Sequence, residues 1–151
     1  MATEIKPAID NNGQLRRAID EWAVAVRAKD IETVMSRYAS DVVAFDVVNP
    51  LEYQGTDLLR KRLTDWLASF EGPFGFEISN LEVEAGNYLA FCHSINRVIG
   101  IKTDGVKVNM CWRATLCCRK IEGRWMITHS HTSVPFDMES GRASLDLKPS
   151  A

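Results

Sequence analysis

The sequence predicts an α+β fold, in which three N-terminal helices pack into a strongly curved antiparallel sheet. Three observations lead to this prediction. Apolar residues recur at helical spacing in the first half of the chain, they alternate with a period of two after residue 75, and tight-turn signals such as Asp104-Gly105 separate the alternating runs. Helices followed by a series of hairpin strands are typical of α+β domains rather than of alternating βαβ folds.

Three segments are expected to be helical. The first runs roughly from residue 8 to residue 28, and Asp30 is expected to cap a short second helix, which Ser40-Asp41 ends. Thr56 is expected to cap the third helix, which Gly72-Pro73 ends. The apolar faces of these helices are Ile9, Leu15, Ile19, Trp22 and Val26 in the first, Ile31, Val34, Met35 and Tyr38 in the second, and Leu59, Leu63, Trp66, Leu67 and Phe70 in the third.

Five segments are expected to be strands. One is the β-branched run between the second and third helices, and four long ones form a meander with an irregularity expected at Ser79-Asn80. Their expected ranges are 42–48, 76–84, 88–101, 106–119 and 124–134. Because long antiparallel strands twist and coil, the sheet should curl around the helices into a cone-shaped α+β barrel. The open mouth of such a cone is a natural place for a small-molecule ligand.

Length and composition describe a single domain over residues 1–151, with a polar C-terminal tail from residue 136 to residue 151. The chain has 18 basic and 20 acidic residues without a basic stripe, so we expect no nucleic-acid partner. The basic cluster Arg60 to Arg62 is expected to be a solvated helix face. No apolar run approaches the roughly 20 residues of a membrane helix and no signal-peptide pattern is visible, so we expect a cytoplasmic protein without a membrane partner.

The last expected strand carries two histidines where apolar residues are expected. Strict alternation places four side chains on one face of this strand: Trp125, Ile127, His129 and His131. Since the tryptophan and the isoleucine mark this face as buried, the imidazoles need partners. They could bond to neighbouring strands, face a ligand, or share a metal ion with a third ligand such as His93 or Asp46. No further metal-ligand motif is visible, and we expect neither a metal nor another cofactor.

Two charged residues also lie within apolar strands. Asp46 follows Val42 and Ala44 on one strand face, where desolvation would raise its pKa toward the range of a general base. Arg113 could pair with a buried carboxylate or anchor an anionic ligand. The alternatives are a strand-end Asp46 paired with a cation or a turn amide, and an Arg113 whose stem covers apolar surface while its head reaches solvent.

Aromatic and polar side chains complete the expected pocket. Trp22 and Trp66 lie at helical spacing, which favours a plain core role for both. The residues that we expect to contact a ligand are Trp22, Tyr38, Tyr53, His93, Trp112 and Arg113.

The chain resembles the SnoaL-like, ketosteroid-isomerase-like superfamily, which shares its cone fold with nuclear transport factor two. The resemblance is carried by residues 25–55, 92–100 and 112–149, and most specifically by the stretch RKIEGRWMITHSHTSVPFD. It implies a homodimer, often formed through the convex face of the sheet, and a hydrophobic cone with polar groups at depth. In the isomerases and polyketide cyclases of this superfamily, a pocket carboxylate takes a proton next to a carbonyl group.

The isomerase base follows a pattern of helix, Tyr-Ala-x-Asp, short strand and acid, and this pattern runs here from Tyr38 to Asp46. The resemblance therefore implies that Asp46 is a base. The chain departs from the isomerases at Trp22, which stands where they place an oxyanion-donating tyrosine, and in the histidine pair, which their site lacks.

Together, the residues and the resemblance lead us to expect proton transfer on a small, mostly apolar carbonyl compound, in an isomerisation, cyclisation or dehydration. Asp46 would be the base, His129 or His131 the acid or oxyanion donor, and Arg113 would orient a polar substituent. The alternative is a non-catalytic ligand-binding or association domain.

Overall fold

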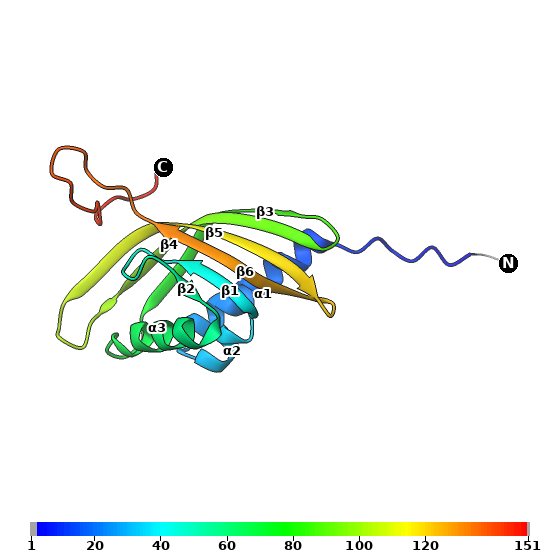
Figure 1. Cartoon of the computed structure of the whole chain (residues 1–151), viewed down its shortest axis with the longest axis horizontal. Coiled ribbons are helices and arrows are strands. Elements are labelled where there is room, and N and C mark those ends of the chain that lie inside the picture. The colour runs from blue at the N-terminus through cyan, green and yellow to red at the C-terminus, as the bar shows by residue number, and fades with distance from the viewer. Residues whose placement is uncertain (1–2, 151) are drawn as a thin grey trace.

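The computed structural model describes residues 3–150, and within them three helices lie against one six-stranded sheet (Figure 1). The helices are α1 (Asn11–Arg27), α2 (Ile31–Met35) and α3 (Thr56–Ala68). The strands are β1 (Tyr38–Phe45), β2 (Tyr53–Gln54), β3 (Gly75–Ala85), β4 (Leu89–Ile101), β5 (Lys107–Ile121) and β6 (Arg124–Ser133). The expected α+β class is therefore confirmed.

The helix starts follow local capping chemistry with one exception. Asp30 caps α2 as expected, since its carboxylate accepts from the N–H of Thr33 at 3.2 Å. The expectation that Thr56 caps α3 is wrong, because Gly55 precedes the helix with φ at +79° and Thr56 is already helical. Ser40-Asp41 does not break a helix either: α2 ends at Met35, and both residues lie within β1.

The sheet has the order β2-β1-β6-β5-β4-β3 and is curved but not closed. The expectation of a purely antiparallel sheet is wrong at one place, because β1 pairs with β6 in parallel. The helices are not all N-terminal, since β1 and β2 precede α3. The other pairs are antiparallel hairpin neighbours, and β3 shifts register between Ser79 and Glu82, where Asn80 adopts a positive φ of 54°. This bulge confirms the expected irregularity.

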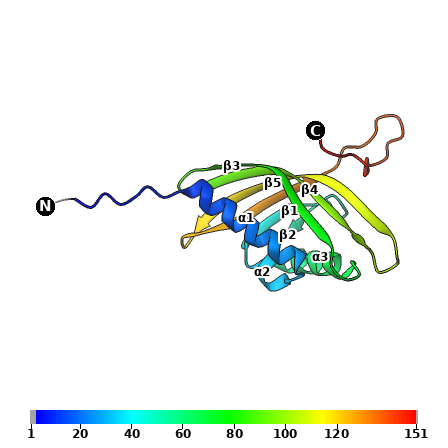
Figure 2. The ribbon, with the colours of Figure 1, turned by 180° about the vertical axis from the view of Figure 1, so that it is seen from behind.

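All three helices lie on the concave side of the sheet (Figures 1 and 2). Two arginines of α1 tie it to β3: Arg27 donates to the carbonyl oxygen of Phe76 at 2.9 Å, and Arg16 donates to that of Leu81 at 3.1 Å. The core lies between the helices and the concave face, and its most deeply buried large side chains are Phe76, Val34 and Val42. The convex face is left without a covering helix.

The tail leaves the end of β6 and turns back on itself. Phe136 forms an isolated bridge with Ala143, and the N–H of Ser144 donates to the carbonyl oxygen of Pro135. Lys148 then donates to the carbonyl oxygen of Asn109 in β5 at 3.2 Å. Within residues 3–150, no helix combines the length and the apolar character needed to cross a bilayer.

Gly100 allows the end of α3 to approach β4 closely. A Cβ atom at this position would lie 2.9 Å from Cδ1 of Phe70 and 3.0 Å from Cβ of Phe74. The rings of Phe70 and Phe74 are stacked, with their centroids 4.5 Å apart. Neither ring can yield without disturbing the other. A side chain at residue 100 would therefore overpack the core.

We predict that Gly100→Ala lowers the free energy of unfolding by about 1–3 kcal/mol, as is typical of overpacked cores. Gly75→Ala is the matched control, because its added Cβ would meet only ordinary contacts at 3.5 and 3.6 Å. Urea unfolding of both variants measures the difference. Equal stabilities would show that the Phe70–Phe74 pair tolerates the methyl group.

Candidate functional site

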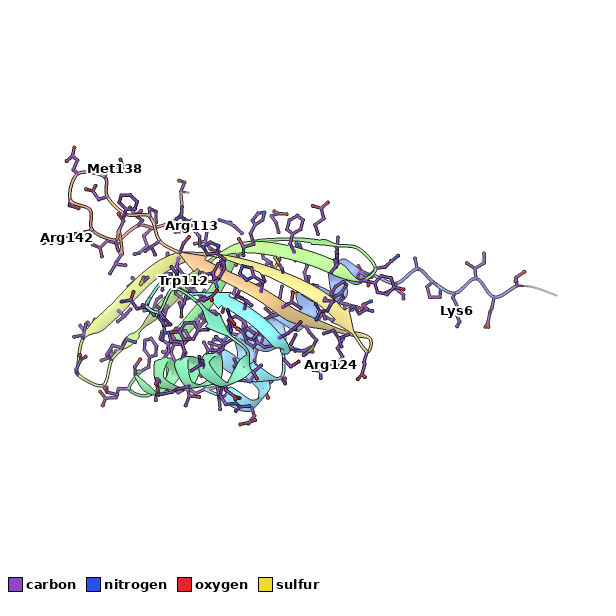
Figure 3. All side chains as sticks on the ribbon, viewed as in Figure 1. Lys6, Trp112, Arg113, Arg124, Met138 and Arg142 are labelled. Carbon is purple, nitrogen blue, oxygen red and sulfur yellow. The ribbon has the colours of Figure 1, made fainter. Side chains whose placement is uncertain are left out.

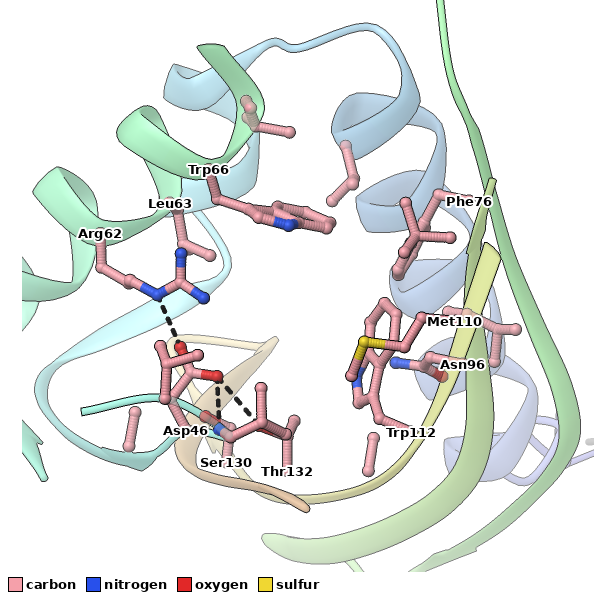
Figure 4. A pocket seen from close by; sticks show the side chains of 18 of the residues that line it. Asp46, Arg62, Leu63, Trp66, Phe76, Asn96, Met110, Trp112, Ser130 and Thr132 are labelled. Atoms are coloured by element: carbon pink, nitrogen blue, oxygen red, sulfur yellow. Dashed lines mark hydrogen bonds and ion pairs between the residues drawn. The ribbon is translucent and has the colours of Figure 1, made fainter. Parts of the chain in front are cut away.

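A cavity of about 660 Å³ lies between the helices and the concave face of the sheet. Its wall is largely aromatic and aliphatic (Figure 4). Trp66 of α3 contacts Phe76 and Trp112 across the interior, with both ring-centroid distances at 6.3 Å and edge-to-face geometry. A volume of this size and an apolar wall with a few polar groups are typical of small-molecule sites.

Asp46 lies in this wall, directly after β1, as a carboxylate with several partners (Figure 4). Its Oδ2 accepts from Nε of Arg62 at 2.9 Å, and its Oδ1 accepts from the N–H of Val47 at 2.6 Å. The hydroxyl of Thr132 also donates to Oδ1, at 3.3 Å. The cation and the turn amide correspond to the alternative that the sequence had left open. These contacts compensate for the loss of water around the carboxylate.

Arg62 was assigned from the sequence to a solvated face of α3, but it lines the cavity. Its side chain is 21% exposed, and its guanidinium points into the interior beside Asp46 (Figure 4). Arg62 lies three residues after Leu59 and four before Trp66 on the helix, so it falls within the apolar stripe. That spacing was the available signal for its orientation.

The predicted inward orientation of His129 and His131 is wrong, because β6 contains a bulge. Cys117 of β5 pairs with His129 while Cys118 pairs with Ile127, so Thr128 is an extra residue without a partner. The alternation of β6 reverses at this point. Before the bulge in the sequence, Ile127 faces the interior, whereas after it Ser130 and Thr132 line the cavity.

Both histidines therefore lie on the convex face, where they pack edge-on against Phe45. The ring-centroid distances from Phe45 are 4.7 Å to His129 and 5.4 Å to His131. His129 donates from Nδ1 to the carbonyl oxygen of Val43 at 2.7 Å, and since a carbonyl can only accept, Nδ1 carries the proton. This bond to a neighbouring strand was one of the alternatives for the pair.

Two other expected ligand contacts also lie on the convex face. His93 is exposed and pairs with Thr115 of β5. Thr115 in turn pairs with His131, so the two histidines lie in the same row across the sheet. Arg113 is exposed too and donates to the hydroxyl of Ser133 at 3.1 Å, whereas its neighbour Trp112 lines the cavity (Figure 3). Within residues 3–150, no three or more His, Cys, Asp or Glu side chains form a group that could hold a metal ion.

The aromatic residues divide between the cavity and the core. Trp22, Tyr38 and Trp112 line the cavity, while Tyr53 is core and donates from its hydroxyl to the carbonyl oxygen of Asn49 at 3.2 Å. Burial raises the pKa of the Tyr38 hydroxyl far above its usual range, so this group stays protonated. The buried indole N–H of Trp22 approaches this hydroxyl but has no acceptor in hydrogen-bond geometry within the described residues.

Asn96 is a cavity residue that was not among the ligand contacts expected from the sequence, because polar residues fall on both faces of its strand. It is 5% exposed and points inward from β4, on the wall opposite Asp46 (Figure 4). Its Oδ1 accepts from the hydroxyl of Ser94 at 2.8 Å, while its amide N–H groups have no protein acceptor within the described residues. Cys92 of the same strand also lines the cavity, but burial raises its pKa to about 11, which keeps the thiol protonated and unreactive.

Comparison with solved structures gives a consistent fold. An NTF2-like protein of unknown function from Pseudomonas putida is 36% identical, with a TM-score of 0.83 over 91% of this chain and 96% of that one. A ketosteroid isomerase-like protein from Erwinia carotovora is 20% identical, with a TM-score of 0.71 over 83% of this chain and 97% of that one.

A third structure, a candidate scytalone dehydratase from Novosphingobium aromaticivorans, is 14% identical, with a TM-score of 0.74 over 91% of this chain and 94% of that one. The last two likenesses concern the fold alone. No curated protein matches the chain. The model of the SnoaL-like domain family matches residues 15–137. This range includes the whole sheet and all three helices except the first residues of α1. The chain therefore belongs to the SnoaL-like family, within the NTF2-like fold.

Proposed function

We propose that the cavity binds a small, mostly apolar compound with a ring system, and that Asp46 transfers a proton on a carbonyl form of it. The observation that carries this proposal is the largely buried carboxylate of Asp46 in the wall of a mainly apolar, aromatic cavity. The isomerase-like and dehydratase-like names of two structural neighbours support the same class of chemistry.

Asp46 retains the capacity to accept a proton. Its Oδ2 has Arg62 as its one protein partner within the described residues, so one acceptor position of that oxygen remains. Ser130 lines the cavity on the neighbouring strand, and its hydroxyl has no protein partner among residues 3–150, so it can donate to a carbonyl oxygen. Removal of a proton next to a carbonyl group needs these two elements: a base, and a donor for the developing oxyanion.

We predict that the protein accelerates exchange of the α-protons of 2-tetralone, a bicyclic ketone, in D₂O, and that Asp46→Asn lowers this rate by about 10²–10⁴-fold. Proton NMR measures the exchange, and calorimetry measures whether the variant still binds the ketone. Asp41→Asn is the matched control, because Asp41 is an exposed β1 carboxylate paired with Arg119. Unchanged exchange in Asp46→Asn would eliminate Asp46 as the base.

A second candidate function is ligand binding without turnover. The ion pair between Arg62 and Asp46 favours it, because the guanidinium already takes up part of the hydrogen-bonding capacity of the carboxylate. The outward placement of the histidines also removes the expected acid from the cavity. Binding of 2-tetralone without any acceleration of exchange in the unaltered protein would establish this second candidate.

We also propose that the chain forms a homodimer through the convex face of the sheet. Three large apolar side chains of β4 are exposed there: Phe91 at 46%, Ile99 at 38% and Ile101 at 45%. Exposed apolar side chains on a sheet face that no described helix covers are typical of interaction surfaces. The three histidines lie on the same face.

We predict that Phe91→Glu converts the dimer to a monomer, because a charge buried in an apolar interface has no partner. Leu58→Glu is the control, since Leu58 is 58% exposed on α3, on the other side of the molecule. Light scattering during size-exclusion chromatography reports the mass of each variant. A monomeric unaltered protein at micromolar concentration would contradict the proposal.

A further inference from the structure

One charged side chain at the α3 wall of the cavity lacks an ion-pair partner among the described residues. Asp46 is paired with Arg62, and Asp65, the other acid of the wall, is paired with Lys61 at 2.7 Å. Lys102 also lines the cavity, but within the described residues no carboxylate lies within ion-pair distance of its ammonium group. Of the two acids and two cations that line the cavity, Lys102 is therefore the one without an ion-pair partner within the described residues.

Lys102 is held rigidly in this position. Its backbone forms an isolated β-bridge with Phe70. On either side of this bridge, the N–H of Glu71 donates to the carbonyl oxygen of Ile101, and the N–H of Thr103 donates to that of Ser69. Its ammonium group donates to the hydroxyl of Ser69 at 2.6 Å and lies 3.9 Å from the centroid of the Phe70 ring. These partners are neutral, so they orient the charge without cancelling it. Burial and, next, the charge of Arg62 lower the pKa of Lys102.

The guanidinium of Arg62 has hydrogen-bond donors that an anionic ligand could use. Only Nε of its guanidinium has a protein acceptor within the described residues, namely Asp46, and the two terminal nitrogens are directed into the cavity (Figure 4). A guanidinium has a fixed fork of five N–H donors, so it can hold one carboxylate from the side and a second from its end. Ser69 directly follows α3 and lies two helical turns after Arg62, about 10 Å along the axis, a span that the long side chains of Arg62 and Lys102 can bridge.

We propose that the ligand of this cavity is an amphipathic monoanion, an aromatic or alicyclic carboxylic acid. Its carboxylate lies between Arg62 and Lys102, and its ring body lies among Trp66, Phe70 and Trp112. This carboxylate supplies the ion-pair partner that Lys102 lacks within the described residues. The amide N–H groups of Asn96 on the opposite wall can donate to an oxygen at the far end of the ring body. This inference rests on the proposed small-molecule function of the cavity.

Two probes that share the naphthalene ring but differ in the charge of its polar group test the inference: 2-naphthoate and the neutral 2-naphthylmethanol, each titrated into the full chain by calorimetry. We expect 2-naphthoate to bind at least about 10-fold more tightly, as a charge-assisted contact requires. Lys102→Met should abolish this preference and leave the affinity for 2-naphthylmethanol within about twofold, because the neutral probe does not depend on the cation. Lys102→Arg should retain the preference.

Lys107→Met is the matched control, because Lys107 is exposed at the other side of the same hairpin and faces away from the cavity. Equal affinities of the two probes for the unaltered protein would overturn the anion inference and leave the proposed cavity function intact. A failure of both probes to bind would overturn the cavity function and the inference with it. Retained preference in a folded Lys102→Met variant, with folding checked by circular dichroism, would remove Lys102 from the site.

Discussion

The parallel pairing of β1 with β6 is the constraint on which the candidate site depends. Because the two strands run in the same direction, their C-terminal ends reach the same edge of the sheet, with Ala44 beside Ser130 and Phe45 beside His131. Asp46 and Thr132 follow at that edge and contact each other. The chain then returns through β2 and α3, which brings Arg62 over the carboxylate. In an antiparallel pairing, Asp46 would lie at the opposite end of β6.

Local patterns in the sequence were sufficient for most of the fold. The expected first helix, from residue 8 to residue 28, is observed as Asn11–Arg27, and the last strand ends one residue before its expected limit at Val134. Periodicity and turn residues determine such elements within short stretches of chain. Strand direction does not follow from periodicity, which is why the parallel pair was missed. The orientation of Arg62 was missed because its two basic neighbours suggested a solvated face.

The two faces of the sheet carry different chemistry. The concave face presents aromatic rings with one carboxylate, hydroxyl groups and one amide, whereas the convex face presents imidazoles, Arg113 and exposed apolar side chains. Since alternate residues of a strand point to opposite faces, each surface can change in sequence with little effect on the other. The proposed ligand recognition and the proposed subunit association can therefore change independently in this chain.

The extra residue at Thr128 affects how residues should be compared between members of the family. A relative without the bulge has one residue fewer in β6 between the buried tryptophan and the end of the strand. An alignment without a gap would then match the inward-facing residues of that relative to His129 and His131, which face outward here. Those columns would then equate a residue of the ligand wall with one of the outer surface. Alignments of this strand should therefore place a single-residue gap at Thr128 before any role is transferred beyond it.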